Sequence, residues 1–581
     1  MAEALQPLDP TAQAQARWRP ALLRQVPALT LALFLAPVGA GLIGTWLPAF
    51  GYFPALGHDS FSVAPWIELW SSPGLGTSVR LTLVSGFLAT VVSLALVLAT
   101  VASCQGTRLF ARLRLLLAPL LAVPHLAVAI GLAFLIAPSG WLVRLVSPWA
   151  TGWTVPPDLA TVQDPYGLAL AAALVLKETP FLFLMTLAAL DQNQAGARLA
   201  VARSLGYGPV TAWLKTVLPA IYPQIRLPVY AVLAFSLSVV DVALILAPTT
   251  PPPLAVQVFR WFNDPDLAQR AVGAAGATLQ LGLVVAAILL WRGLELALAR
   301  GARPWLVAGG RGGPGTVTRA LAGTAVVICF ALAVGGVLAM ALWSFARRWR
   351  YPDVLPSAWT LDNWIRQGDG LAWSAGTTLI VGLAAAVIAL ALVLGCLENE
   401  RRYGLTTTNR VLWLLYTPLL VPQVGFLFGN QVLAVTAGLD GTWLALIWSH
   451  LLFVLPYVFL ALADPYRALD ERYSRAALCL GASANRVFWT VKLPMLLRPV
   501  LVALAIGFAV SVAQYLPTIF AGGGRFVTLT TEAVSLASGA DRRVIGVYTF
   551  LQALLPLAGF AAALTIPAWL YRDRRALRGH P

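Results

Sequence analysis

The chain has 581 residues, of which 59% are hydrophobic and only 11% are charged, and its mean hydropathy is +0.78. A soluble globular protein has roughly 45–50% apolar and about 25% charged residues, so this composition excludes that class. The net charge of +16 would also suit a nucleic-acid-binding protein, and the distribution of the basic residues decides between the two.

The predicted elements are apolar helices that follow one another along the whole chain. A helix needs about 20 apolar residues to cross a hydrocarbon core of ~30 Å. The first apolar run is longer than the ~7–15 residues of a signal peptide, so we expect it to remain as the first span. The expected fold class is an all-α polytopic membrane protein. Twelve spans are predicted, at residues 26–50, 75–103, 113–138, 166–190, 229–247, 271–299, 318–345, 373–397, 410–437, 441–463, 499–520 and 544–571.

The basic residues lie mostly on one side of the predicted spans. If the N-terminus is cytoplasmic, the seven cytoplasmic segments hold 28 of the 40 Lys and Arg residues and the six outside segments hold 11. Such an excess follows the positive-inside rule of membrane proteins. It explains the net charge without nucleic acid as a partner, and it places both chain termini in the cytoplasm.

The Cys and His residues form no recognisable site. The four cysteines are isolated, and their spacing suits neither a disulfide framework nor a zinc site. The four histidines are scattered, so we expect no metal and no cofactor in this chain. A membrane-embedded enzyme would need a cluster of His, Asp or Glu at one membrane face, and none is evident.

The second half of the chain repeats the first. For example, Thr82 recurs as Thr378 at an offset of 296, and later residues recur at an offset of 273. An even number of spans in each repeat makes the two repeats parallel, related by an axis along the membrane normal. The expected units are a first six-span repeat, a glycine- and arginine-rich cytoplasmic linker and a second six-span repeat, at 1–300, 301–317 and 318–581.

One short motif occurs in both halves, each time in a predicted cytoplasmic loop between the fourth and fifth spans. The first copy occupies 200–206 and, after nine further residues, leads to a Thr-Val-Leu-Pro sequence that ends at Pro219. The second copy occupies 475–481 and, at the same spacing, leads to a Val-Lys-Leu-Pro sequence that ends at Pro494. The identical spacing indicates one structural element used twice.

The residues of this motif predict two short helices joined by a fixed corner. Good helix formers precede Gly206 and Gly481, and a glycine there adopts the left-handed conformation that closes a helix. A second helix then begins, with Pro209 in its first turn in one copy and Ser483 as its cap in the other. We expect the Leu-Pro pair to end this element, because proline lacks the amide donor.

The repeated motif resembles the EAA loop of the permeases of binding-protein-dependent ABC importers, and most closely that of the fused permeases of the iron, thiamine and polyamine branch. The resemblance implies a type I importer fold in the bacterial inner membrane, a periplasmic solute-binding protein and two cytoplasmic ATPase subunits that carry ATP and Mg²⁺. No Walker A sequence occurs in the chain, so the chain itself is expected to be no enzyme. The residues that the resemblance assigns to ATPase coupling, in loops 191–226 and 464–498, are Ala202, Gly206, Trp213, Leu218, Pro219, Ala476, Ala477, Gly481, Phe488, Leu493 and Pro494.

The chain departs from the family pattern at the glutamate that names the motif. Ala200 and Arg475 stand at that position, and Val201 replaces the first alanine of the first copy. This weakens the case for an acidic contact with the ATPase. One copy alone would equally suit an amphipathic interfacial hairpin, but two copies at the same place in the two halves favour a docking element.

Charged residues inside predicted spans mark a candidate pathway. Lys177 and Glu178 lie in the fourth span, and Asp241 lies in the fifth, where Gln514 aligns with it in the second half. A charge at that depth costs ~2.5–3.5 kcal/mol or more, so it usually faces a cavity or a partner. Glu178, Asp241 and Gln514 are predicted to line the translocation path. The alternative is a structural ion pair of Lys177 with Asp241 or Glu178.

The alternative function is that of a gradient-driven secondary transporter with twelve spans in two parallel halves. That class normally has a charged Gly/Asp/Arg signature between its second and third spans, and the segment 104–112 does not fit it. Nor does that class predict the repeated loop. The sequence therefore favours the importer permease.

Overall fold

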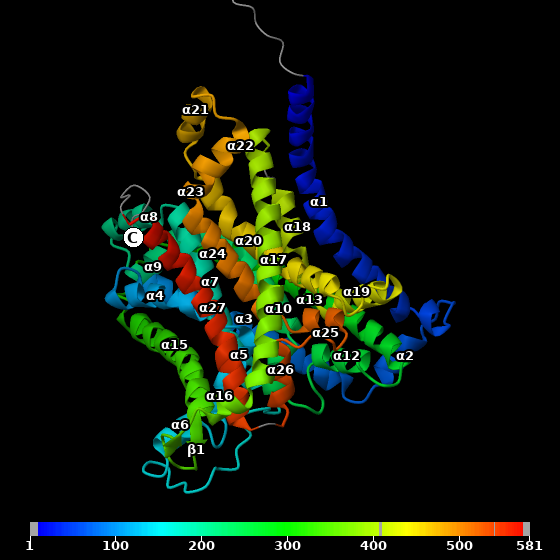
Figure 1. Cartoon of the computed structure of the whole chain (residues 1–581). Coiled ribbons are helices and arrows are strands. Elements are labelled where there is room, and N and C mark those ends of the chain that lie inside the picture. Colours follow the sequence, from blue (N-terminus) through cyan, green and yellow to red (C-terminus); the bar gives the residue numbers. More distant parts are fainter. Residues whose placement is uncertain (1–9, 406–408, 540, 573–581) are drawn as a thin grey trace, which may run out of the picture.

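The structure is a computed structural model that describes residues 10–405, 409–539 and 541–572, and nearly every element in that part is a helix. A two-stranded antiparallel hairpin, β1 (Ala346–Arg348) and β2 (Ala358–Trp359), lies at the end of the molecule opposite the start of α1 (Figure 1). The helices before the linker are α1 (Pro10–Ala49), α2 (Ala64–Ser71), α3 (Leu75–Cys104), α4 (Arg108–Ala122), α5 (His125–Ile136), α6 (Trp141–Val146), α7 (Leu168–Gln192), α8 (Ala195–Ser204), α9 (Pro209–Ala212), α10 (Leu218–Ser238), α11 (Asp241–Leu246), α12 (Leu254–Phe262) and α13 (Gln269–Gly301).

The remaining helices follow a similar order of long and short elements. They are α14 (Arg303–Val307), α15 (Thr316–Phe345), α16 (Asp362–Arg366), α17 (Gly368–Arg402), α18 (Asn409–Leu420), α19 (Val424–Thr436), α20 (Trp443–Arg467), α21 (Glu471–Cys479), α22 (Ala484–Val487), α23 (Leu493–Met495), α24 (Leu497–Val512), α25 (Leu516–Gly522), α26 (Leu529–Ala537) and α27 (Arg542–Leu570).

The described part of the chain has ten helices that are long and apolar enough to cross a membrane, or eleven if one bent pair counts as a span. The bent pair is Ala484–Met495 with Leu497–Val512, at an angle of 77°. The sequence predicts twelve spans. Against eleven, the difference lies in the predicted span 410–437, which is divided into the shorter helices α18 and α19. Against ten, the predicted span 499–520, whose first part lies in the bent pair, is missing as well.

A proline stands at this division and at a second one between α4 and α5. Pro124 directly precedes α5, and Pro422 lies between α18 and α19. Val123 is extended, with ψ 127°, as a residue before a proline usually is. The continuous helix predicted over 113–138 is therefore broken at Pro124, because proline removes a helix hydrogen bond and clashes with the preceding turn.

The parts of the chain before and after the linker interleave. α1 packs against α17 and α19, and α15 packs against α3 and α5; the first of these contacts runs along the blue helix in Figure 1. Both contacts require glycine. A β-carbon on Gly429 would lie 2.0 Å from the carbonyl oxygen of Gly41, and one on Gly131 would lie 2.8 Å from the carbonyl carbon of Gly336. Small residues allow such close approach of helix backbones inside a membrane.

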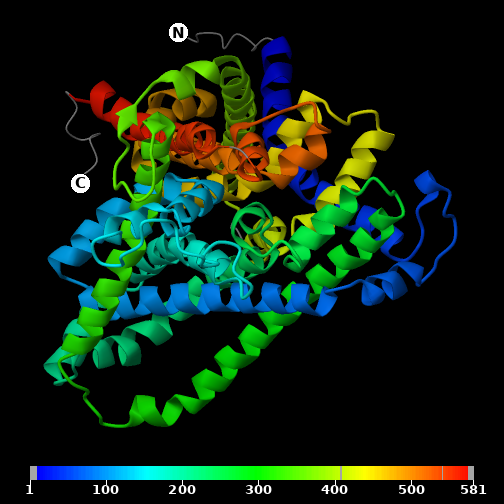
Figure 2. The same ribbon diagram turned by 90° about the horizontal axis from the view of Figure 1, so that it is seen from below.

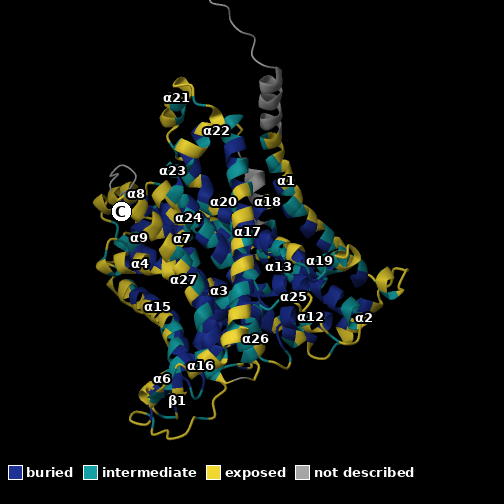
Figure 3. Cartoon of the chain, in the orientation of Figure 1, coloured by how far each residue is buried: buried dark blue, intermediate teal, exposed yellow. Residues whose placement is uncertain are grey.

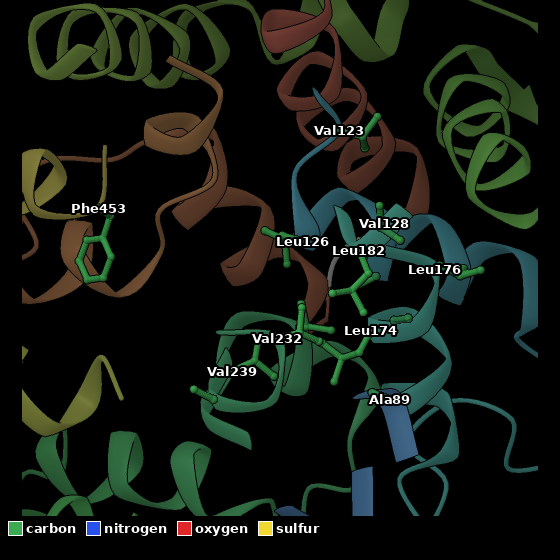
Figure 4. Packing of buried hydrophobic residues seen from close by; sticks show 14 of the residues in the cluster. Ala89, Val123, Leu126, Val128, Leu174, Leu176, Leu182, Val232, Val239 and Phe453 are labelled. Carbon is green, nitrogen blue, oxygen red and sulfur yellow. The ribbon is translucent and has the colours of Figure 1, made fainter. Parts of the chain in front are cut away.

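Apolar side chains from facing helices fill the interior. Figure 4 shows Leu126 and Val128 of α5 beside Leu174 and Leu182 of α7 and Val232 of α10, all of which are buried. The outward faces of α13, α15 and α17 also carry large apolar side chains, and these are exposed (yellow in Figure 3). A helix bundle in a membrane has apolar side chains both in its interior and on its outer surface, because the surrounding lipid tails are apolar too.

Candidate functional site

Two loops, one after α7 and one after α20, share one local structure. In the first, α8 ends before Gly206, α9 follows, and the π-helix Trp213–Val217 leads into α10. In the second, α21 ends before Gly481, α22 follows, and the π-helix Phe488–Lys492 leads into α23. Both glycines are left-handed, with φ +85° and +83°, so the predicted corner is confirmed in both loops.

The short helices begin where the sequence predicts. Pro209 stands in the first turn of α9, where no amide donor is needed. Ser483 caps α22, and its hydroxyl oxygen accepts a hydrogen bond from the amide of Arg486 at 3.3 Å. Asp470 caps α21 in the same way, accepting from the amide of Arg472 at 2.9 Å. Local sequence therefore sets the geometry of both loops.

The prediction that the Leu-Pro pair ends this element is wrong. Leu218 opens α10 with Pro219 in its first turn, and Leu493 and Pro494 open α23 in the same way. Proline in a first turn breaks no helix hydrogen bond, so the π-helix continues directly into the next helix. In the first copy the result is one helix over Pro209–Ser238, whereas the second copy bends after α23.

The predicted coupling residues divide into internal supports and surface residues. Ala202 and Trp213 are 3% and 0% exposed, and they hold α8 against its π-helix rather than facing a partner. Gly206 and Gly481 lie at the surface. Of the others, Pro219 and Ala476 are exposed, and Leu218, Ala477, Phe488, Leu493 and Pro494 are half-buried.

Sequence reasoning missed one exposed leucine at the same position of each loop. Leu205 and Leu480 directly precede the two glycines and are 60% and 88% exposed. Each directly follows a helix, α8 or α21, that is largely exposed (yellow in Figure 3). The available signal was a leucine at the same position of both copies, immediately before the glycine.

A buried carboxylate ties the second loop to α17. Glu398 accepts hydrogen bonds from Lys492 Nζ at 2.8 and 3.0 Å, from Arg402 Nε at 2.7 Å and from the Tyr466 hydroxyl. Glu398 and Lys492 are 4% and 7% exposed, so their interaction is shielded from water. Lys492 belongs to the π-helix and Tyr466 to the end of α20, so one carboxylate joins both ends of the loop. Arg402 also donates to Asn485 of α22 at 2.9 Å.

A second arginine extends this connection to α21. Arg401 donates to the carbonyl oxygen of Leu469 at 2.6 Å, and its Nε lies 3.2 Å from Glu471. Glu471 also accepts a hydrogen bond from Arg475 at 2.6 Å. That hydrogen bond, together with the charge of Arg401, holds the pKa of the Glu471 carboxyl below its usual range. Arg475, which stands at the position of the motif glutamate, is thus paired with an acid one turn earlier in α21.

The charges of the fourth span have separate partners. Lys177 donates to the backbone carbonyls of Leu120, Leu121 and Val123 at 3.3, 2.9 and 2.6 Å. Its ammonium group therefore completes the end of α4, a favourable place for a cation, instead of pairing with an acid as the alternative prediction had it. Glu178 lies 3.1 Å from His125 Nε2.

Asp241 lies near this His–Glu pair. It opens α11 after the break that ends α10, it is half-buried, and it interacts electrostatically with His125 and with Tyr515. Gln514 lies in the break between α24 and α25, but its amide donates to the carbonyl of Val510 on its own helix at 3.2 Å. The structure thus brings Asp241 toward the pair and turns Gln514 aside. His125 and Tyr515 were not predicted as residues of this site. Only His125 had a signal in the sequence, because it directly follows the helix-breaking Pro124.

Buried side chains satisfy the backbone groups that these breaks leave free. Gln280 donates to the carbonyl of Leu237, near the end of α10, at 2.9 Å. Near the end of α24, Gln552 donates to Thr530 at 2.6 Å, and Thr530 donates in turn to the carbonyl of Val512. Backbone groups inside a membrane need such partners, so both breaks are held in place.

Within residues 10–405, 409–539 and 541–572, no group of three or more His, Cys, Asp or Glu side chains is arranged to hold a metal ion. All four cysteines are free, and Cys479 of α21 is exposed.

Comparison with known proteins gives consistent matches. The model of the family described as binding-protein-dependent transport system inner membrane component matches residues 379–572. The inner membrane ABC transporter permease protein YnjC of Escherichia coli K12 is 34% identical over 523 residues, which cover 89% of this chain and 93% of that protein. The thiamine transport system permease protein ThiP of the same organism is 26% identical and covers 80% of this chain and 84% of its own. The putrescine transport system permease protein PotI, also from that organism, is 24% identical and covers 33% and 72%.

Similarity over nearly the full length of an ABC permease confirms the predicted permease function, and the alternative of a gradient-driven transporter is wrong. The family carries no catalytic activity, and its members work in systems that include an ATPase and a solute-binding protein. The chain belongs to the multi-pass inner-membrane permease subunits of binding-protein-dependent ABC importers.

Proposed function

We propose that the loops 191–226 and 464–498 are the docking sites of two cytoplasmic ATPase subunits, one on each loop. The observation that carries the proposal is that the same element is built twice: a short helix, a left-handed glycine, a second short helix and a π-helix that leads into a longer one. In each copy an exposed leucine, Leu205 or Leu480, is available to enter a groove on a partner. ATP and Mg²⁺ belong to those partner subunits.

The same proposal treats the chain as two fused six-span repeats. Paired contacts support it: Thr82 Oγ1 accepts a hydrogen bond from the amide of Leu254, and Thr378 Oγ1 accepts one from the amide of Leu529, both at 2.9 Å. The glycine contacts of α1 with α19 and of α15 with α5 form a second pair. The match to PotI covers 72% of PotI but only 33% of this chain, which is most of the length of one repeat. The proposed units are 1–300, the linker 301–317, and 318–581.

The orientation of the chain is part of the proposal. Both loops lie on the upper side of Figure 1, toward the start of α1, and we assign that side to the cytoplasm on the basic charge of its segments. The solute-binding protein then docks at the other end, in the periplasm. The termini predicted to be cytoplasmic, within residues 1–9 and 573–581, lie outside the described residues.

The translocation path is proposed to pass the broken helices, past Asp241 and Glu178, with Gln514 near the corresponding break of the second repeat. A carboxylate at membrane depth favours a positively charged solute, because the two charges offset each other's desolvation. His125 packs against Phe235 with ring centroids 4.6 Å apart, and aromatic faces near a carboxylate also attract cations. ThiP and PotI are named for thiamine and putrescine, which are cations. We infer an organic cation as the solute class.

Coupling follows from the stiffness of the loops. Each loop is bonded into the spans on both sides, so the approach of the two ATPase subunits on binding ATP moves the loops toward each other. The spans then shift as rigid elements and open the path to the binding protein outside, while ATP hydrolysis returns them. The chain supplies binding and mechanical coupling only.

The first test is purification of the tagged chain in mild detergent, with mass identification and quantification of the proteins that co-elute. Two copies of one ATPase subunit, or one copy each of two, for each permease chain is the expected result. Replacement of both Leu205 and Leu480 by Asp should abolish co-elution. A chain that retains two ATPase copies after both replacements would contradict docking at these loops.

A further inference from the structure

The linker between the two proposed repeats is seated on the first loop. The amide of Gly208 donates to the carbonyl oxygen of Arg311 at 2.8 Å, and Lys215 Nζ donates to the carbonyl oxygen of Ala308 at 2.6 Å. The same ammonium group lies 4.9 Å from the ring centroid of Trp305 in α14. In Figure 2 the green chain leaves α13 and α14 and turns back at the lower left toward α15, beside the teal helices of the first loop.

At this contact, which we call the seat of the linker, glycines of the linker and the loop lie directly against each other's segment. A β-carbon on Gly208 would lie 2.1 Å from the carbonyl oxygen of Gly313, and one on Gly312 would lie 1.9 Å from Thr211 Oγ1. Neither position has room for any other residue. The side chain of Arg311 reaches Gly206, where a β-carbon would be 3.4 Å from Arg311 Cδ. The linker therefore packs beside the corner, and Gly206 itself stays exposed.

The second loop has no such cover among the described residues. No atom lies within 4 Å of a β-carbon built on Gly481. That loop is held instead from α17, through Glu398 and Arg401. The two loops share a local fold but present different surfaces at the same structural position.

The outer side of the linker is open and basic. Residues 309–314 are exposed although their inner side packs on the loop. Arg311 joins Arg198 and Arg203, which are exposed on α8. Exposed arginines therefore lie both on α8, in the segment that leads to Leu205, and on the linker, whose Arg311 side chain reaches Gly206.

We propose that residues 308–315 are a fixed part of the first docking surface, so that the ATPase subunit on the first loop binds a composite of α8 and the linker, while its counterpart binds α21 alone. The partner face that meets the linker is expected to carry acidic residues, since opposite charges steer such contacts. The inference rests on the proposed docking of ATPase subunits at these loops, and it makes the two ATPase positions inequivalent.

Site-directed cross-linking within the full importer tests this inference. Single cysteines are placed at Gly310, Leu205 and Leu480, with Gly301→Cys as the control and Cys479→Ser in every variant to remove the exposed native thiol. Gly301 and Gly310 both have open space around them. A short thiol-to-amine reagent should link the ATPase to positions 205, 310 and 480, and not to 301.

The outcomes separate the inference from the docking proposal. Cross-links at 205 and 480 without one at 310 would overturn the composite surface and leave docking intact. Absence of cross-links at both 205 and 480 would overturn docking itself, and the composite surface with it.

A second variant tests whether the packing of the linker on Gly208 is needed for the composite docking surface. Gly208→Ala cannot keep the linker in place, so trypsin should cleave after Arg311 several-fold faster than in the parent, and the cross-link from position 310 should weaken while that from 480 persists. Gly301→Ala should behave as the parent. If Gly208→Ala instead increases ATPase binding at the first loop, the linker is a cover that blocks docking, and the proposal is wrong.

Discussion

The corner of each loop depends on a single glycine. Gly206 and Gly481 hold φ +85° and +83°, a region that other residues enter at a cost of roughly 1–2 kcal/mol. Because this strain acts on the backbone, it would be present whether or not space is available for a side chain.

Replacing both glycines by valine should uncouple ATP hydrolysis from transport without preventing membrane insertion. The corner would relax toward ordinary φ values and change the direction of α8 and α21 relative to the spans, whose apolar surfaces are untouched. ATPase activity and solute uptake would be measured together in proteoliposomes, with Gly282→Val, on an open face of α13, as the control. Normal uptake by the double variant would refute the coupling assignment.

Glu398 is the residue on which the second loop most depends for stability. Glu398→Gln leaves Lys492 buried with a weakened partner, and breaking a buried pair costs roughly 3–5 kcal/mol. We expect a clear fall in the Tm of the detergent-solubilised protein. Glu400→Gln is the control, since its ion pair with Arg467 is partly exposed and such pairs contribute about 0–1 kcal/mol.

Removing the second charge should restore part of the loss. The double variant Glu398→Gln, Lys492→Met should melt above Glu398→Gln alone, because no buried ammonium group is then left without its carboxylate. Equal melting temperatures for Glu398→Gln and Glu400→Gln would show that the buried pair does not hold the loop.

Asp241 is the residue that should distinguish cations from neutral solutes. Asp241→Asn keeps the shape and removes the charge, so transport of a cation such as thiamine should fall by about tenfold or more, which corresponds to ~1.4 kcal/mol. Stimulation of the ATPase by the binding protein should persist. Asp369→Asn, at an exposed position of α17, is the control. Unchanged uptake of every cation transported by the parent would exclude Asp241 from the path.

At the scale of elements, the two loops reach the same shape by different supports. The second is held by the buried pair of its own Lys492 with Glu398 of α17, whereas the first is held by the linker and by the buried ring of Trp213. The helix after the first loop is continuous, and the helix after the second bends by 77°. Equal local structure therefore does not imply equal mechanical response.

The exposed leucines should contribute unequally to docking. Leu480→Asp removes the main apolar contact of the second loop, and the loss of a central apolar contact typically costs ~2 kcal/mol or more, about 30-fold in affinity. Leu205→Asp should cost less, because the linker still contacts the ATPase. Binding of the purified ATPase to each variant measures the difference, and both substitutions should leave Tm unchanged because both sites are exposed. A larger loss for Leu205→Asp would contradict the composite surface.

At the scale of the whole molecule, the two parts of the chain hold each other through exchanged helices. α1 lies on α17 and α19, and α15 lies on α3 and α5. Each part therefore buries some of its helix faces against the other.

A valine at the centre of one exchanged contact should separate these helices. The β-carbon of Gly429→Val would lie 2.0 Å from the carbonyl oxygen of Gly41, so α1 must move away, at a cost of at least ~1–3 kcal/mol for overpacking. Gly39→Val, two residues from Gly41 and with no atom within 4 Å, is the matched control. Thermal melting in detergent should fall for Gly429→Val alone; equal melting of the two variants would show that the exchanged contact contributes little.

The sequence by itself determined those features that depend on local chemistry. Apolar runs of sufficient length fix most of the spans, because each helix satisfies its own backbone hydrogen bonds in the membrane. The two loops were predictable in their corners and caps, because Gly206, Gly481, Pro209 and Ser483 act through their own backbone geometry. The family followed from the spacing of these residues.

The tertiary structure alone decided which distant groups meet. Lys492 and Glu398 are 94 residues apart in the sequence but are hydrogen-bonded to each other. Neither sequence segment predicts this contact with the other. The same holds for the seat of the linker on Gly208 and for the exchange of α1 and α15. Local conformational preferences are short-range and can be read along the chain, whereas contacts of packing and charge depend on how complete helices fit together.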